Sequence, residues 1–90
     1  MLVNNPQRVF YALASLPRRQ IIAFLSQTAL STADLADRFR MSRPAISRHL
    51  SVLQRAGLIA GERQGQRVLY RLRRDALLFG NYVAAAEADV

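Results

Sequence analysis

Cysteine, lysine and tryptophan are absent from this 90-residue sequence, and histidine occurs once, as His49. Without cysteine there is no disulfide, no thiol nucleophile and no thiolate metal site, and a reducing compartment is favoured. A single histidine without cysteine leaves no hydrolytic triad, and no glycine-rich loop suits nucleotide phosphates. We therefore expect a protein that is not an enzyme.

Long hydrophobic runs are also missing, since no stretch approaches the roughly 20 apolar residues that cross a bilayer. The first six residues lack the basic start and the long apolar stretch of a signal peptide. We expect a cytoplasmic protein with no membrane partner. With 51% hydrophobic residues, the length suits a single domain, residues 1–90, with one modest core.

Negative charge is scarce in the middle of the chain. All 13 basic residues are arginine, against six acids, and residues 38–74 alone carry a net charge of +9. Residues 75–90 carry a net charge of −3. A coding bias toward arginine would explain the missing lysine, but it would not explain the clustering. The cluster indicates a surface that binds a polyanion, and the arginine guanidinium can form paired hydrogen bonds to both phosphates and guanine edges.

Apolar periodicity predicts a mainly α chain with a small β-hairpin, in the order α-α-α-α-β-β-α. Helices are expected over about residues 6–14, 17–27, 32–39 and 44–56, strands from 58 and over 67–72, and a last helix from Asp75. Ser31 or Thr32 caps the third helix, Ser42 caps the fourth, and Gly57 ends it. A turn at Gln64–Gln66 joins the strands.

The helix over 44–56 has a free polar face. With Ile46, Leu50 and Leu53 turned inward, its outward face carries no large apolar side chain. That face consists of Pro44, Ser47, Arg48, Ser51 and Arg55. An ordinary solvated helix would look similar, but the preceding helix and tight turn, the following hairpin and the local charge favour a helix-turn-helix that enters the DNA major groove.

We expect base readout from Arg43, Ser47 and Arg48. Phosphate and minor-groove contacts are expected from a larger set: Ser42, His49, Ser51, Arg55, Arg63, Gln64, Gln66 and Arg67. The hairpin residues of this set surround Gly65 and could instead only solubilise a loop. A lone His49 could be a pH switch or a ligand, but such a residue more often packs at the core edge and donates one hydrogen bond to backbone or phosphate.

Residues 47–58, Ser-Arg-His-Leu-Ser-Val-Leu-Gln-Arg-Ala-Gly-Leu, are close to the signature of the ArsR/SmtB family of bacterial repressors. The resemblance covers about residues 5–74. Residues 13–22 resemble the family's Asp-Pro-Thr-Arg stretch, with the proline one place later, at Pro17. The resemblance implies a winged helix-turn-helix homodimer, associated with the nucleoid, that binds an inverted-repeat operator in double-stranded DNA and represses transcription, often of its own gene.

Residues that sense metals in this family are not matched. Ser31 and Ala33 occupy the two cysteine positions of one family pattern, and the last predicted helix offers Asp75, Glu87 and Asp89 but no histidine. Carboxylates alone are weak ligands for zinc-like ions. We expect no metal and no cofactor.

The first and last predicted helices carry more apolar residues than a small core needs. We expect them to form the dimer interface, through Val3, Val9, Phe10, Leu13, Leu77, Leu78, Tyr82 and Val83. The alternative is that they complete the protomer's core. Two rival functions also stay open, a winged helix that binds another protein and a nonspecific DNA- or RNA-binding protein.

Overall fold

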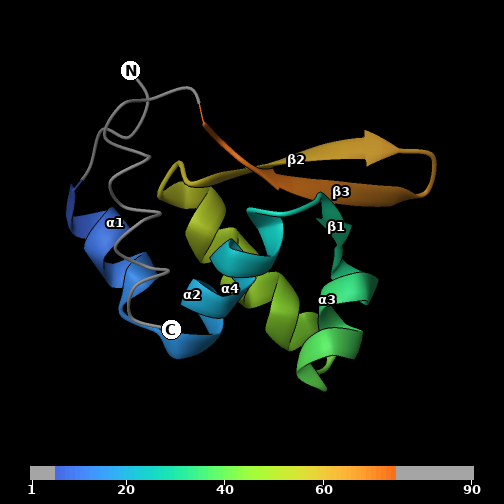
Figure 1. The fold of residues 1–90 in the computed structure, drawn as a ribbon, viewed down its shortest axis with the longest axis horizontal. Helices are drawn as coiled ribbons and strands as arrows, with labels where there is room; N and C mark the ends of the chain where they lie inside the picture. The colour runs from blue at the N-terminus through green and yellow to red at the C-terminus, as the bar shows by residue number, and fades with distance from the viewer. Residues whose placement is uncertain (1–5, 75–90) are drawn as a thin grey trace.

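The computed structural model describes residues 6–74 of the chain (Figure 1). Four helices and a three-stranded antiparallel sheet follow one another as α1 (Pro6–Leu13), α2 (Leu16–Leu25), β1 (Leu30–Ser31), α3 (Thr32–Phe39), α4 (Arg43–Arg55), β2 (Ile59–Gln64) and β3 (Arg67–Leu72). The mainly α fold with a small hairpin is confirmed. The helix predicted from Asp75 lies outside the described residues.

Helices α1 and α2 meet at a sharp corner built by Ser15. Its side chain accepts a hydrogen bond from the Arg18 N–H at 3.4 Å, so Ser15 caps α2, and Pro17 lies in the first turn, where no backbone donor is needed. The shift of the proline noted in the sequence therefore leaves a regular helix start. Val9 and Ala12 on α1 are completely buried.

Helix α3 begins with a capping box. The Ser31 hydroxyl accepts from the Asp34 N–H at 3.1 Å, and the Ser31 N–H donates to the Asp34 carboxylate at 3.0 Å. The hydrogen bond from the Ser31 backbone first, and then the interaction of its hydroxyl with the carboxyl group, lower the pKa of Asp34. Ser31 is thus the cap, one of the two residues the sequence allowed. Arg40 ends α3 with φ 55°, and the short turn from Arg40 to Ser42 leads into α4.

The sheet has the strand order β1-β3-β2. The two-residue loop Gly65–Gln66 joins β2 to β3, and Gly65 has φ 67°, which glycine adopts without steric cost. Strand β1, in which Leu30 pairs opposite Tyr70 and Ser31 opposite Leu69, was not predicted from the sequence. Two residues are too short to show an alternating pattern, and their pairing depends on a strand about 40 positions away.

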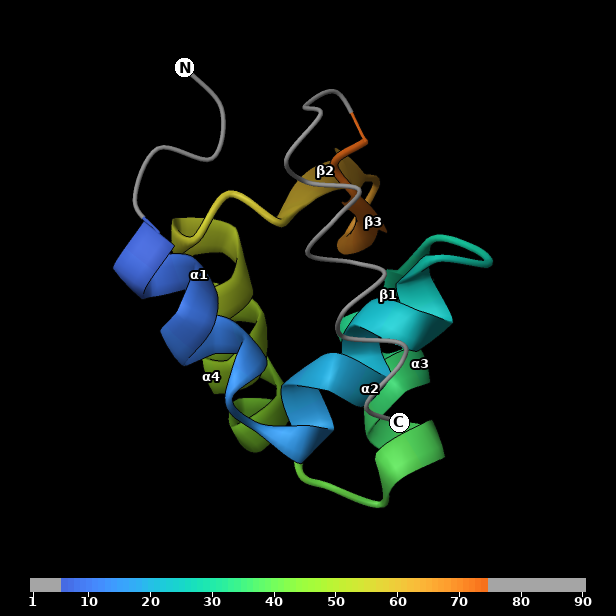
Figure 2. The same ribbon diagram turned by 60° about the vertical axis from the view of Figure 1, so that its left-hand side comes forward.

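Helix α4 lies at the centre of the fold. It contacts α1, α2, α3 and β2 (Figures 1 and 2), and its inward residues Ile46, Leu50 and Leu53 are at most 1% exposed. The prediction of these three core positions and of the helix itself is confirmed, with each end shifted by one residue. Since α4 is held by packing on one face, its orientation is fixed while its other face stays open.

Candidate nucleic-acid interface

The open face of α4 carries the predicted polar set. Ser47, Arg48 and Arg55 are exposed, Ser51 is half-exposed, and Ser42, Arg43 and Pro44 are exposed at the N-terminal end. The Ser42 hydroxyl accepts a hydrogen bond from the Ala45 N–H at 3.2 Å. Ser42 therefore serves as the helix cap, with the remaining lone pair and the hydroxyl proton free for a second contact.

The hairpin formed by β2 and β3 places a second polar group beyond the helices. Its loop lies on the side away from α1 (Figure 1), and Arg63, Gln64, Gln66 and Arg67 are all exposed. The Arg63 guanidinium donates to the Gly65 carbonyl at 3.4 Å, so this side chain folds toward the loop in the free protein. Helix α4 and this wing together present the two elements that the sequence predicted for the interface.

Glu62 is the only acid between residues 38 and 74, and it is paired. Its carboxylate lies 3.3 Å from the Arg71 guanidinium, with both side chains more than half exposed. An exposed pair of this kind contributes little stability. Its consequence here is electrostatic, because the negative charge of Glu62 is neutralised within the sheet.

The prediction that His49 packs at the edge of the core is confirmed, whereas its contact with phosphate stays a prediction. The half-buried ring lies on the side of α4 that packs against the α1–α2 corner, where its Nδ1 is 3.2 Å from an amino group of Arg18. An arginine only donates, so Nδ1 accepts and the ring is neutral. Burial first, then the charges of Arg18 and Arg48, lower the pKa of His49.

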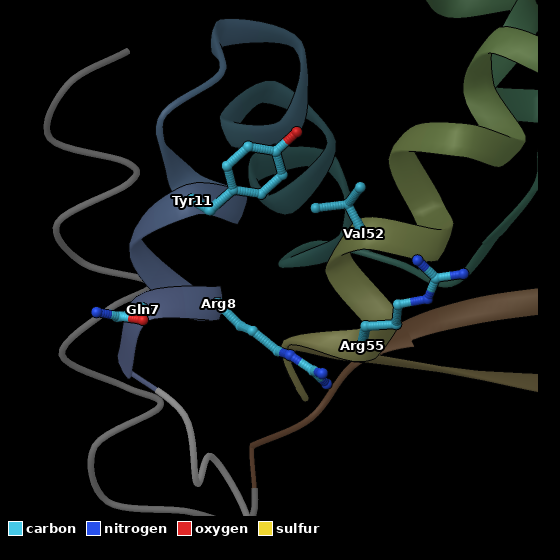
Figure 3. Close-up of a pocket in the computed structure, with 5 residues that line it drawn as sticks. All are labelled: Gln7, Arg8, Tyr11, Val52 and Arg55. Atoms are coloured by element: carbon cyan, nitrogen blue, oxygen red, sulfur yellow. The ribbon is translucent and has the colours of Figure 1, made fainter.

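Arg55 lies at the rim of a hollow between α1 and α4. The hollow has a volume of about 390 Å³ and is lined by Gln7, Arg8, Tyr11, Val52 and Arg55. Figure 3 shows Arg8 reaching from α1 toward α4, with Val52 and Arg55 on the α4 side. Arg55 is thus exposed at the C-terminal end of the helix, farther from the α3–α4 turn than Arg43, Ser47 and Arg48.

The predicted dimer residues separate into three groups. Val9 is 0% exposed, so it belongs to the protomer's core and cannot reach a partner, which corrects its assignment. Leu13 is half-buried against the same core, whereas Phe10 is 61% exposed. Val3, Leu77, Leu78, Tyr82 and Val83 lie outside the described residues. The amphipathic pattern of α1 could not tell Val9 from Phe10, because they are adjacent.

Residues 6–74 contain no group of three or more His, Cys, Asp or Glu side chains placed to hold a metal ion. Within the same range, no helix is long and apolar enough to cross a membrane.

Two helices joined by a tight turn, the second with a free basic face and followed by a hairpin, define a winged helix-turn-helix DNA-binding domain. The comparisons with known proteins give the family. Residues 17–60 match the family described as bacterial regulatory protein, arsR family. The transcriptional repressor SdpR of Bacillus subtilis is 36% identical over 75 residues, which are 83% of this chain and 80% of SdpR. The chain belongs to the ArsR/SmtB family of bacterial transcriptional regulators.

Solved structures agree with the fold. HlyU from Vibrio cholerae N16961 superimposes with a TM-score of 0.77 at 30% identity, covering 92% of this chain and 85% of HlyU. The homodimeric winged helix-turn-helix DNA-binding domain of Mb0332 from Mycobacterium bovis, determined by NMR, also gives a TM-score of 0.77, at 32% identity, covering 92% of this chain and 79% of that domain. The protein is accordingly a DNA-binding transcriptional regulator and not an enzyme.

Some relatives are longer than the matched region. The regulator Rv2034 of Mycobacterium tuberculosis is 40% identical over 69 residues, and this match spans 64% of Rv2034.

Proposed function

We propose that this protein is a homodimeric repressor that binds an inverted-repeat operator, with one α4 in each of two successive major grooves. The observation that carries the proposal is the open face of α4, where Arg48 and Ser47 are exposed on a helix whose opposite face is locked into the core. Arg43, Ser47 and Arg48 read bases, because they belong to the N-terminal half of the helix, which enters the groove.

Phosphate contacts come from the flanks of this face. Ser42, Pro44 and Ser51 lie along α4, and the wing residues Arg63, Gln64, Gln66 and Arg67 follow the backbone toward the minor groove. Arg55, at the far end of α4, contacts phosphate beside the groove. These contacts fix the position of the protein on the duplex and carry little sequence information.

The proposal of a homodimer follows from the same geometry. A single reading helix contacts only a few base pairs, and a two-fold axis provides a second half-site about 34 Å away. Phe10 on α1 is 61% exposed and Leu16 is 49% exposed, which leaves apolar surface for a partner copy. The Mb0332 domain, which superimposes well, is a homodimer.

Repression is favoured over activation because SdpR, matched over 80% of its length, is a repressor. In the sequence comparison, HlyU is matched over only 56% of its length, and it is named a transcriptional activator. The regulated gene can be the protein's own, so the upstream DNA of that gene is the first fragment to test, in a promoter-reporter assay with and without the protein.

The DNA-reading proposal is tested by two matched arginine variants on a selected duplex. Duplexes that bind the wild-type protein are selected from a random pool. The affinity for the most enriched fragment is then compared with the affinity for a scrambled one. Arg48→Ala should lose about 1–3 kcal/mol on the selected fragment and little on the scrambled one, since it removes a base contact. Arg67→Ala should weaken both alike and lower the slope of log K against log salt by about one.

Two outcomes would contradict the proposal. If no sequence is enriched over competitor at physiological salt, the protein is a nonspecific nucleic-acid binder. If Arg48→Ala binds the selected fragment with wild-type affinity, α4 does not read bases through this residue. A surface used against another protein would show neither DNA enrichment nor a salt-dependent affinity.

A further inference from the structure

The guanidinium of Arg18 lies where α1, α2 and α4 meet, and each of its three nitrogens has a partner. Nε donates to the Ala12 carbonyl at 2.8 Å, and one amino group donates to the Tyr11 carbonyl at 3.0 Å. The other amino group donates to Nδ1 of His49 at 3.2 Å. The guanidinium carbon also lies 5.0 Å from the centre of the Tyr11 ring. One side chain of α2 therefore joins the last carbonyls of α1 to the middle of α4.

This junction depends on a neutral imidazole. Nδ1 can accept from Arg18 only while it carries no proton. The charged groups that face the ring are Arg18 from α2 and Arg48 from α4, and α1, α2 and α4 contain no aspartate or glutamate. Protonation would remove the hydrogen bond and place a third positive charge beside two others, with no carboxylate on these helices to balance it.

We propose that Arg18 is a positioning residue for DNA binding, which holds the reading helix α4 against the end of α1 through neutral His49 and releases it when His49 is protonated. The proposal rests on the proposed function, since α4 is the helix that reads DNA. It adds a direction for pH, namely that DNA affinity falls on acidification. Because Phe10 of the proposed dimer surface is on α1, the same junction sets how far apart the two reading helices lie.

Arg19 provides a matched control for Arg18. It follows directly in α2 and also caps α1, with a 2.8 Å bond to the Leu13 carbonyl, but within residues 6–74 it makes no hydrogen bond to α4. Arg18→Gln removes two bonds to α1 and one to α4, whereas Arg19→Gln removes one bond to α1. Arg18→Gln should therefore lower the affinity for the selected duplex at least fivefold more than Arg19→Gln, since one useful hydrogen bond is equivalent to about fivefold. Equal losses in the two variants would show that only α1 capping matters, and the proposal would be wrong.

His49→Leu covers the case in which Arg18→Gln does not fold. It removes the acceptor on α4 while leaving the two bonds from Arg18 to α1 in place. A thermal melt checks that the variant is folded, and its affinity should fall by a factor similar to that of Arg18→Gln. Wild-type affinity in folded His49→Leu would overturn the proposal.

The pH profile supplies a readout that a merely structural role would not give. His49 is the only histidine, so wild-type affinity for the selected duplex should be level near pH 8 and should fall as the pH is lowered toward about 5.5. His49→Gln keeps an oxygen that accepts from Arg18 but does not titrate, so it should retain affinity and lose this dependence. An affinity that rises on acidification in the wild type, but not in His49→Gln, would mean that protonated His49 binds phosphate, contrary to the proposal.

Failure of the proposed function is distinguishable from failure of this inference. If the wild-type protein selects no duplex at any pH, the DNA-reading proposal fails by itself. If it selects a duplex and the Arg18 and His49 variants behave like Arg19→Gln, only the positioning role fails.

Discussion

Individual arginines serve two different purposes in this chain. Arg18, Arg19 and Arg74 direct their guanidinium groups to backbone carbonyls, the last donating to Ser26 at 2.8 Å and so tying the end of β3 to α2. Arg43 and Arg48 are exposed on the open end and face of α4. Net charge alone cannot separate these groups, because both add the same charge to the sequence. Their hydrogen bonds separate them, because Arg74 is as exposed as Arg43 and Arg48 and yet donates to a backbone carbonyl.

Gly61 is a residue at which the wing depends on a missing side chain. A Cβ placed there would lie 2.9 Å from both Cε1 of Tyr70 and Cγ1 of Val68, closer than real Cβ atoms approach. Gly61→Ala should therefore destabilise the fold by about 1–3 kcal/mol, as overpacking does. Urea unfolding measures the loss, and Val68→Ala in the Gly61→Ala background should recover part of it.

Gly65→Ala is the control for this prediction, because nothing lies within 4 Å of its added Cβ and its φ is 67°. Its cost is conformational, about 1 kcal/mol, and Val68→Ala should not relieve it. Equal rescue of both glycine variants by Val68→Ala would show that the close approach at Gly61 is not what destabilises the protein.

At the scale of elements, sequence reasoning succeeded where local physics decides the outcome. The caps at Ser31 and Ser42 and the inward spacing of Ile46, Leu50 and Leu53 are local, and they predicted α3 and α4 to within a residue. The two-residue strand β1 was missed because its pairing is with β3, far along the chain. The contact between His49 and Arg18 was missed for a related reason, since the two residues are 31 positions apart in the sequence.

The junction of α1, α2 and α4 predicts a dependence of stability on pH. The pKa of His49 lies below its ordinary value of 6.5 in the folded protein, mainly because the ring is partly buried. The unfolded chain therefore binds more protons in this range, so stability is complete above about pH 6.5 and is lost as the pH falls through the folded value. Thermal melts between pH 8 and pH 5, recorded for the wild type and for His49→Gln, should show a steeper decline in the wild type.

Parallel curves for the two proteins would mean that His49 titrates alike in the folded and unfolded states. The capping carboxylate of Asp34 does not confuse this comparison, because its pKa is lowered from 3.8 and its contribution is lost only at more acidic pH.

For the whole molecule, the sequence alone does not tell which apolar residues pack in the protomer's core and which contact a partner. Val9 lies in the core and Phe10 is 61% exposed, although the two residues are neighbours on α1. Periodicity marks the apolar stripe of a helix but not its edges, and only packing against α2 and α4 decides where the buried part ends.

Phe10→Lys tests the proposed dimer interface, and its effect on dimerisation can be told apart from the effect of the added positive charge on DNA affinity. A lysine in place of the exposed ring should dissociate the dimer at micromolar concentration, as measured by sedimentation equilibrium. The added positive charge alone would strengthen binding to DNA. A loss of affinity for an inverted repeat, with little loss on an isolated half-site, therefore shows that the dimer has dissociated.

Phe24→Lys is the control variant. Phe24 is 37% exposed and packs edge-to-face on Phe39, away from α1, so its replacement should leave the oligomeric state unchanged. A dimeric Phe10→Lys protein with wild-type affinity for the inverted repeat would place the interface elsewhere.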